Sequence, residues 1–542
     1  MKNYKFKKEL SSIILTIIFM LVYYFFMLPP INLTSPVFWF SVIVTIIFYI
    51  SVSGIGNLSG YGSFDQKGNF YRNPSYRVNN KLGYILGFTG VLIILLFLIN
   101  LIYSPIFNSK AYANRIKVTE GGVFTDDVKP VDFKKLALLD KNSSEKLGDR
   151  VMGQLPELVS QFDVSSIYTQ INYKEKIERV TPLEYADIFK YFTNRKEGIK
   201  GYIKVDSVTG ESSLQKFSKG MKYVPSAILH EDLLRKLRFS YPGDIFGDIT
   251  FEINDEGNPY WIVPVLKYKG IGLRKEVSHL IIFNPIDGKS KKYQTSKVPD
   301  WVDHVFSSEL ITEQINDWGK YKNGFLNSIF GQKGVVATTE GYNYLVMNND
   351  VYMTTGITSA VSDESNVGFI LTNLRTKETN FYEVPGAEEY SAMESAKGQV
   401  QQMNYTATFP ILINLNNKPT YIISLKDKAG LVKMYAFVDL VDYQKVTVTD
   451  SSKGIEFAAK NYLGNAIDET KEKNSKTIEI KSITNLMIDG DTYFYIIDKD
   501  NNKYKVGLKV NENILPFVKI NDKLKIAFSK HEINEIISIE NP

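Results

Sequence analysis

Three long apolar runs open the chain, and none of them contains Asp, Glu, Lys or Arg. They span residues 11–28, 37–53 and 82–106. Each is long enough to cross the hydrocarbon core of a bilayer as a helix, which takes about 20 residues. Pro29, Pro30 and a second apolar run follow the first run without a small-residue cleavage site, so the first run predicts a span and not a signal peptide. We expect residues 1–106 to form a membrane domain with three transmembrane helices.

Positive charge flanks the predicted spans unevenly. Four lysines precede the first span, the 29–36 loop has no charged residue, and the loop between the second and third spans carries Lys67, Arg72, Arg77 and Lys81. Cytoplasmic loops are enriched in Lys and Arg. The sequence therefore predicts a multi-pass protein of the cell membrane, with a cytoplasmic N-terminus and a large extracellular domain after about residue 106.

A stalk and one helix are predicted for residues 107–164. Asn142 followed by Glu145 has the spacing of a helix N-cap with a capping box. Apolar residues at 147, 151, 155 and 159 give that helix one apolar face, and Pro156 should kink it.

The rest of the chain is organised by a repeated turn. Short apolar runs rich in branched and aromatic residues predict strands, and four of these runs end in an Asx residue followed by a tight turn. The four turns are Asp206–Gly210, Asn284–Gly288, Asn373–Lys377 and Asp439–Tyr443. An Asx side chain bonds the backbone two residues on, and Gly at the fifth position accepts a left-handed conformation. The last two turns lack that Gly, so we expect them to be looser.

Helices and a second hairpin accompany the turns. We expect a helix over 182–192 before the first turn, and one after each Val-Pro pair at 224–225, 298–299 and 384–385. The apolar faces comprise Leu229, Leu233 and Leu237 in the first of these three, and Val302, Val305, Phe306 and Leu310 in the second. Strand pairs precede three turns, at 250–253 with 258–265, 342–347 with 350–357, and 409–415 with 418–425.

This fixed order predicts an α+β protein built from repeated helix-plus-antiparallel-sheet modules, at residues 165–334 and 335–465. The helix after Val384-Pro385 is the only helical pattern between the last two sheets, so we expect those sheets to share it within one unit of about residues 335–450. Its loops 359–368 and 426–430 are the predicted contact surfaces.

The C-terminal residues 466–542 change character. A polar stretch at 465–475 predicts a linker after a short helix at 455–463. Five or six short alternating strands then predict a small closed β-barrel of SH3-like or OB-like kind.

The module order resembles PepSY modules, in which a helix leads into a small antiparallel sheet whose last hairpin carries an Asp-x-x-Thr-Gly turn. The match is best at 205–210 and 283–288 and covers residues 165–465 at module level. The stretch 330–441, with FGQKG and EEYSAMESAKGQVQQ, also resembles a family of membrane-anchored proteins of low-GC Gram-positive bacteria without an assigned activity. That resemblance implies no catalytic residues.

Charge and cysteine content narrow the function classes. The net charge is +5, but residues 1–102 hold eight Lys/Arg against two Asp/Glu, which leaves −1 for the rest. The large domain therefore lacks the basic surface of a nucleic-acid-binding protein. The chain has no cysteine, which excludes disulfides, thiol catalysis and thiolate metal sites.

Candidate catalytic and metal-binding residues are weak at sequence level. His230, His279, His304 and His531 have no metal-ligand spacing, and the Asp498–Asn502 turn lacks the glycine and glutamate of a calcium loop. Ser143-x-x-Lys146 and Ser213-x-x-Lys216 match a serine–lysine motif only at minimal length. Glu388 and Glu389 are adjacent, so they diverge on a helix. The glycines at 54–62 follow a membrane helix and predict an ordinary loop.

We therefore assign no catalytic, cofactor-binding or metal site. Charged groups are absent from the spans, which favours anchoring over ion transport. The expected function is a membrane-anchored binding, scaffold or regulatory protein for other envelope components, with the lipid bilayer and envelope proteins as partners. The alternative is an envelope hydrolase or processing enzyme with an unrecognised carboxylate site, for example around Asp363-Glu364 and Glu388-Glu389.

Overall fold

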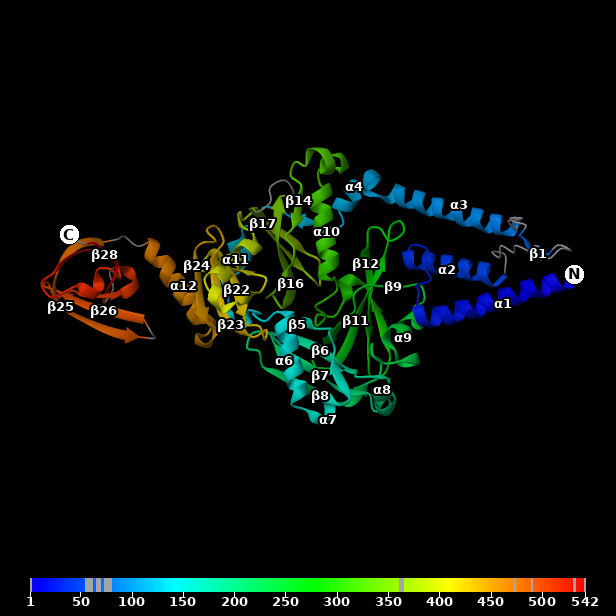
Figure 1. Cartoon of the computed structure of the whole chain (residues 1–542), viewed down its shortest axis with the longest axis horizontal. Coiled ribbons are helices and arrows are strands. Elements are labelled where there is room, and N and C mark those ends of the chain that lie inside the picture. Colours follow the sequence, from blue (N-terminus) through cyan, green and yellow to red (C-terminus); the bar gives the residue numbers. More distant parts are fainter. Residues whose placement is uncertain are drawn as a thin grey trace. The chain divides into compact units, whose positions relative to one another are not determined.

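The structure is a computed structural model, and it describes residues 2–53, 62–64, 70–72, 80–359, 365–470, 474–488, 491–529 and 533–540. The chain divides into two compact units, Met1–Val446 and Thr447–Pro542, which are described separately (Figure 1).

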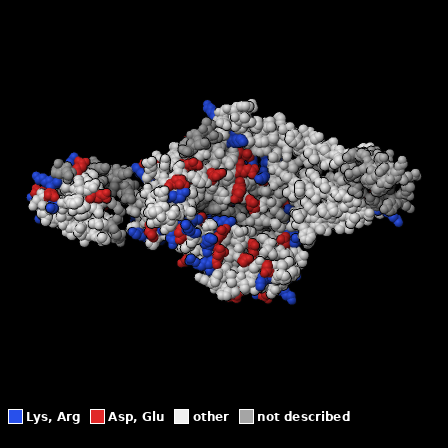
Figure 2. Space-filling model, viewed as in Figure 1, with Lys and Arg blue, Asp and Glu red and all other residues white. Residues whose placement is uncertain are grey.

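Three helices of the first unit are long and apolar enough to cross a membrane, as predicted. They are α1 (Lys2–Met27), α2 (Pro36–Ser53) and α3 (Asn80–Tyr103). α1 packs on α2, with the rings of Phe19 and Phe48 stacked 3.9 Å apart. On the face shown in Figure 2, charged side chains are scattered over the modules, whereas the region of the spans is almost wholly uncharged. Two short strands, β1 (Gly62–Phe64) and β2 (Phe70–Arg72), lie between α2 and α3 in the sequence.

Four sheets of the same topology follow the membrane helices. In each sheet the first two strands both pair with the third, the third pairs with the fourth, and the fourth with the fifth. A helix precedes each set of five strands in the sequence, and the third sheet has two additional strands, one on its fourth strand and one on its fifth. The predicted order of helix, strand pair and turn is thus repeated four times, and we call these units the first to fourth modules.

The elements of the first and second modules are as follows. The first module comprises α6 (Lys141–Gly153), α7 (Pro156–Val159), β4 (Phe162–Val164), β5 (Thr169–Tyr173), β6 (Lys176–Tyr185), α8 (Ile188–Asn194), β7 (Ile199–Asp206) and β8 (Ser212–Met221). The second comprises η2 (Leu229–Glu231), α9 (Leu233–Ser240), β9 (Ile245–Phe246), β10 (Thr250–Ile253), β11 (Pro259–Lys267), β12 (Glu276–Phe283), β13 (Ser290–Tyr293) and η3 (Thr295–Lys297).

The third and fourth modules repeat the order. The third comprises α10 (Ser308–Tyr321), η4 (Asn327–Gly331), β14 (Val336–Thr338), β15 (Asn343–Met347), β16 (Asp350–Ser359), β17 (Ser365–Asn373), β18 (Thr379–Tyr382) and β19 (Gly386–Ala387). The fourth comprises α11 (Glu389–Gly398), η5 (Gln401–Met403), β20 (Thr406–Ala407), β21 (Ile411–Leu415), β22 (Lys418–Lys426), β23 (Val432–Asp439) and β24 (Val446–Asp450), the strand in which the first unit ends. The stalk contributes α4 (Pro105–Ala113), β3 (Val118–Thr119), α5 (Phe124–Asp127) and η1 (Phe133–Lys135), and β3 pairs in parallel with β18.

The sheet of the second module is buried on both faces. Trp261, Val263 and Phe283 belong to one core with the first sheet, α6 and α9. Ile262 and Ile282, which alternate with them, belong to another core with α10 and the third sheet. Burial of both faces explains why β11 and β12 are continuous apolar runs instead of alternating ones.

The four Asx turns have the predicted geometry at their first residue. The carboxyl or amide oxygen of Asp206, Asn284, Asn373 and Asp439 accepts the backbone N–H groups two and three residues on. The expectation of a looser third turn is wrong. Lys377 adopts the left-handed conformation, with φ 67°, and its N–H bonds the carbonyl of Asn373 at 2.9 Å, as a Gly would. The fourth turn is longer by one residue, because Asp439 pairs with the carbonyl of Lys445.

Several predicted helix boundaries are wrong. The cap of α6 is Asp140, whose side chain accepts the N–H of Ser143, and not Asn142. Residues 182–185 continue β6 because they pair with β7 and β4, so the helix there is only α8. α9 begins at Leu233, after Leu229. α10 begins at Ser308 with Ser307 as its cap, since Val302, Val305 and Phe306 are buried in an irregular segment.

The expectation that the third sheet depends on the helix after Val384-Pro385 is also wrong, although Glu389 and Tyr390 of that helix do touch the third module. α10 packs on β14 of the third sheet, and α11 packs on β20, β22 and β23 of the fourth. Each of these sheets therefore has its own helix, the one that precedes it in the sequence. Whether the two modules unfold together stays a prediction.

The second unit contains the predicted closed barrel. Its strands lie in the order β25-β26-β27-β29-β28, and β28 closes on β25. Its elements are η6 (Ser451–Lys453), α12 (Ile455–Thr470), β25 (Asn474–Ile488), β26 (Asp491–Asp498), β27 (Lys503–Gly507), η7 (Leu508–Val510), η8 (Leu515–Phe517), β28 (Lys523–Ser529) and β29 (Asn534–Glu540). α12 extends into the stretch predicted as a linker.

Candidate functional site

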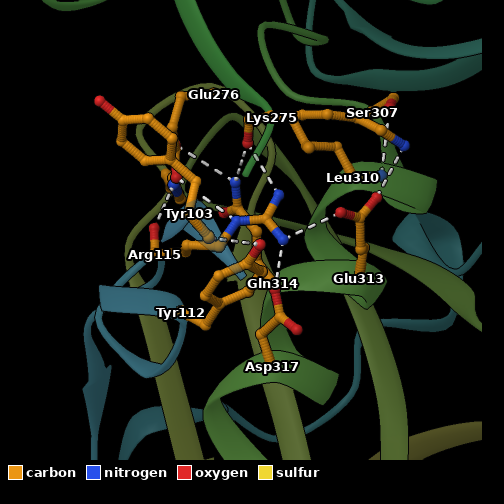
Figure 3. Close-up of polar contacts among 11 residues, drawn as sticks. Tyr103, Tyr112, Arg115, Lys275, Glu276, Ser307, Leu310, Glu313, Gln314 and Asp317 are labelled. Atoms are coloured by element: carbon orange, nitrogen blue, oxygen red, sulfur yellow. Dashed lines mark hydrogen bonds and ion pairs between the residues drawn. The ribbon is translucent and has the colours of Figure 1, made fainter. Parts of the chain in front are cut away.

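Arg115 joins the exit of the third span to the second and third modules. It follows α4, which directly continues α3, and its side chain is only 2% exposed. One terminal nitrogen donates to Glu313 at 2.9 Å and to Asp317, and the other donates to the backbone carbonyl of Lys275 at 2.8 Å (Figure 3). The two acids lie four residues apart on one face of α10, so both meet the same guanidinium.

Two lysines and another acid complete this cluster, which we call the Arg115 network. Lys377 donates to the carbonyl of Arg115 at 2.6 Å and to Glu276 at 3.1 Å. Lys275 pairs with Glu313 at 2.9 Å. The side-chain charges balance: Arg115 and the two lysines face Glu276, Glu313 and Asp317. The bonds of Lys377 also explain how a lysine is held in the left-handed turn position.

Burial and ion pairing act in opposite directions on these carboxyls. For Glu313, burial favours the neutral form, but hydrogen bonds from Lys275 and Arg115 outweigh it, so the pKa is lowered. For Asp317, burial wins over Arg115 and the pKa is raised. Removing the arginine would leave Glu313 with Lys275 but would take from Asp317, whose side chain is 17% exposed, the cation that pairs with it, which is costly.

The second module also contacts the C-terminal ends of α1 and α3 and the residues just before α2. Arg235 donates to the carbonyl of Phe25 at 3.1 Å, and Arg238 donates to that of Leu28 at 2.9 Å. The last carbonyls of a helix lack partners within it, so these α9 arginines cap α1. The N–H of Ile31 bonds the carbonyl of Pro242 at 2.7 Å.

The loop between β11 and β12 reaches the other two spans. Asn100 of α3 bonds the N–H and the carbonyl of Ile271 at 2.7 and 3.1 Å, and Gly272 bonds the carbonyl of Thr34 beside α2. Gly272 has φ +73°, and a Cβ there would lie 2.6 Å from Pro36. Glycine is therefore required by both the backbone conformation and the close approach. These contacts and the Arg115 network form a junction between spans and modules.

A cavity of about 260 Å³ opens beside the Arg115 network. It lies between β9, β11, β12 and the start of α10. Its polar lining residues are Asp248, Tyr268, Lys275, Ser307, Glu309 and Glu313. Lys275 and Glu313 thus take part both in the network and in the cavity wall.

A second polar cluster is buried where the first three modules meet. Glu252 is 0% exposed and accepts the N–H groups of Asp303 and His304 at 2.8 and 3.1 Å. Asp303 accepts the N–H of Asn172 at 2.7 Å, and His304 Nε2 lies 2.7 Å from the carbonyl of Gln170. Burial raises the pKa of both carboxyls, and the charge of Glu252 raises that of Asp303 further.

The candidates weighed from sequence are scattered. His230 is exposed on η2, His279 lies 3.5 Å from Asp244, and His304 belongs to the buried cluster just described; His531 lies outside the described residues. Among described residues, no group of three or more His, Asp and Glu could hold a metal ion. The hairpin tip expected at Asp498 is present, with the N–H of Asn502 bonded to the carboxylate.

Other candidates have structural contacts. Ser143 donates to the carbonyl of Gly430, while Ser213 and Lys216 lie on β8. Glu388 is the cap residue of α11 and Glu389 is buried. Asp363 and Glu364, and the glycines at 54–61, lie outside the described residues.

Sequence reasoning missed the junction residues. In the sequence, Arg115 is one of three cations after the third span, with Lys110 and Lys117, and nothing distinguishes it from them. Glu313 and Asp317 lie on the polar side of α10 with Glu309 and Lys320, so no pattern in the sequence distinguishes them from solvent-exposed acids.

Comparisons with known proteins assign no family. No family model matches the chain, and no curated protein matches it. Among solved structures, a crystal structure of an ACO/RPE65 chimera is 9% identical and is aligned over 69% of this chain, with a TM-score of 0.13. The alignment spans 65% of that chain, slightly less than two thirds, and so low a TM-score supports no common fold.

Proposed function

We propose that this protein is a multi-pass membrane protein with a cytoplasmic N-terminus, whose external modules bind, organise or regulate other components of the cell envelope. The observation that carries the proposal is the junction. Hydrogen bonds from α9 and from the β11–β12 loop reach the ends of α1, α2 and α3, and Arg115 joins α4 to α10. Contacts of this kind between modules and transmembrane helices suit a protein that presents a binding surface at a fixed distance from the membrane. They also suit a protein that transmits a conformational change across the membrane.

Two finer assignments belong to the same proposal. The four helix-plus-five-strand modules are PepSY-like, since a helix leads into an antiparallel sheet whose last hairpin has an Asx turn. The barrel is OB-like: β25 pairs β28, and β27 pairs β29 in parallel, which gives the strand order 1-2-3-5-4. Both module types serve as binding scaffolds without implying one chemistry.

Topology is tested with single cysteines, because the chain has none of its own. Lys67→Cys should resist a membrane-impermeant maleimide on intact cells, and Val441→Cys should react. The reverse pattern would refute an external location of the modules.

Partner binding is tested by pull-down with the full chain in nanodiscs. The predicted loop 426–430 is partly engaged with α6, through Ser143 and Gly430, but Lys428 and Ala429 in it are exposed. Replacing these two residues should reduce capture of envelope proteins, whereas replacing the exposed Asp255-Glu256 hairpin tip should not. Equal capture by both variants would contradict this contact surface.

The alternative of an envelope hydrolase is favoured by one observation, the raised pKa values of Glu252 and Asp303, since acid–base sites contain such groups. Both carboxyls are fully buried and bond backbone N–H groups, which favours a structural role. Hydrolysis of cell-wall polymer or protein by the purified chain, abolished by Asp303→Asn in a variant that still folds, would establish the enzyme instead.

A further inference from the structure

Six large apolar side chains are exposed on neighbouring elements of the first two modules. They are Ile188, Phe189 and Phe192 on α8, Leu229 on η2, and Leu234 and Phe239 on α9, with exposed fractions from 45% to 77%. We call this the α8–α9 surface. Single exposed apolar residues are ordinary, but a group of six on adjacent elements indicates a partner.

A chain of contacts connects this surface to the end of α1. On α8, the Tyr191 hydroxyl bonds the carbonyl of Ile228 at 3.1 Å and the carboxylate of Glu231 at 2.7 Å. Arg235 then bonds the carbonyl of Leu229 at 2.6 Å and that of Phe25 at 3.1 Å. Phe239 lies 5.7 Å, ring to ring, from Tyr24. The surface therefore begins where the first span ends.

The topology of the modules gives a second, independent argument. In the second module, the connection between the third and fourth strands is the loop that reaches Asn100 and Pro36 at the spans. In the first module, the corresponding connection carries α8. The connection between the third and fourth strands therefore contacts the transmembrane helices in the second module, and in the first module it carries α8 with its exposed apolar side chains.

We propose that the α8–α9 surface inserts into the leaflet at the C-terminal end of α1. The first two modules would then contact the lipid directly, in addition to their covalent connection to the transmembrane helices. Phe26 and Met27 at that end are 63% and 64% exposed, so apolar surface continues from the span onto α9. Lys190, Arg195 and Arg235 flank the apolar residues, and their long side chains can remain at the level of the lipid headgroups. The inference rests on α1 crossing the membrane, but not on which side the modules lie.

The test uses an environment-sensitive fluorophore at single cysteines of the full chain in nanodiscs, with one chain per disc. Phe189→Cys is the test position, 77% exposed, and Val441→Cys, at 78%, is the matched control in the last turn of the fourth module. We expect blue-shifted emission at position 189 and quenching by nitroxide-bearing lipids severalfold greater than at 441. An unchanged thermal midpoint shows that each variant folds.

Two results would overturn the proposal. One is emission and lipid quenching at position 189 equal to those at 441. The other is emission from an apolar environment without quenching by nitroxide lipids, because the occupant would then be protein. A failure of the external location would appear in the maleimide experiment and would leave lipid quenching at 189 intact.

Discussion

Glu389 is the first residue of α11 and is 2% exposed, so its carboxyl is buried between the third sheet and the fourth module. It lies over Gly356: a Cβ there would be 2.4 and 2.5 Å from its two oxygens. Oxygen Oε2 meets no hydrogen-bond donor of the described residues. The helix N-terminus favours a negative charge, but burial without full hydrogen bonding opposes it.

Burial raises the pKa of Glu389 from its ordinary 4.5 to about 7; nearby backbone N–H groups and Thr339 lower it, and the charge of Glu388 raises it. The folded state therefore keeps a proton that the unfolded chain loses near pH 4.5. Stability is highest below that pH and declines as the pH rises through 7. At ~1.4 kcal/mol per pH unit, the rise in pKa from 4.5 to about 7 gives a full penalty above pH 7 of about 3.5 kcal/mol.

Glu389→Gln replaces the carboxyl with a neutral group of the same shape. We expect the variant to match the wild type at pH 5 and to be more stable by about 2–3 kcal/mol at pH 8, or several degrees in thermal midpoint. Thermal unfolding of the full chain in nanodiscs, followed by tryptophan fluorescence, measures the stability of each variant at both pH values. Glu394→Gln, at an exposed position of the same helix, should change stability by less than about 0.5 kcal/mol at either pH. Wild-type and Glu389→Gln curves that stay parallel from pH 5 to 8 would refute the reasoning.

Three further predictions concern the junction and the first module. Arg115→Met should cost about 3 kcal/mol in thermal unfolding, because Asp317, whose side chain is 17% exposed, loses the cation that pairs with it. Lys275→Met, at a side chain 41% exposed, should cost under about 1 kcal/mol, and equal costs for the two variants would contradict the network. Gly272→Ala should cost about 1–3 kcal/mol, while Gly243→Ala, whose nearest neighbour atom is 3.6 Å away, should be nearly neutral. Proteolysis of the loop between α1 and α2 reports the difference. Asp140→Ala should cost about 1–2 kcal/mol through loss of the cap, and Asp140→Asn should retain it. Burial raises the pKa of Asp140, but hydrogen bonds from a lysine and a serine outweigh burial, so the pKa is lowered. The stability that Asp140 contributes is therefore lost as the pH falls, which is the opposite of the pH dependence expected for Glu389. An effect of Asp140→Ala that does not change with pH would contradict this explanation.

The repeated order was predictable because its signals are local. An Asx residue that bonds N–H groups two and three residues on is a property of five consecutive residues, and it gave the hairpins at Asp206, Asn284, Asn373 and Asp439. Helix starts were less predictable, since tertiary burial competes with periodicity. Val302, Val305 and Phe306 have helical spacing, yet they fill the core between the second and third sheets as an irregular segment.

The junction was not predictable for a different reason. Arg115 meets Glu313 and Asp317 about 200 residues away, and the sequence gives no register between a stalk and a distant helix. Glycine at 272 could be read as a turn residue, but its close approach to Pro36 depends on how the second module lies against α2. Contacts of this kind follow from packing and not from local pattern.

The connection between the third and fourth strands links these findings. In the second module it carries the loop that bonds α3 and the start of α2, and in the first it carries α8. In the fourth module the equivalent loop is 427–431, which belongs to the surface predicted from sequence for partner contacts and bonds Ser143 of α6 at Gly430. The strands at either end of this connection are fixed by sheet pairing, so its length and composition can change without loss of the core. One topological position thus reaches the spans in one module and another module elsewhere, which is how copies of one fold can take different tasks within one chain.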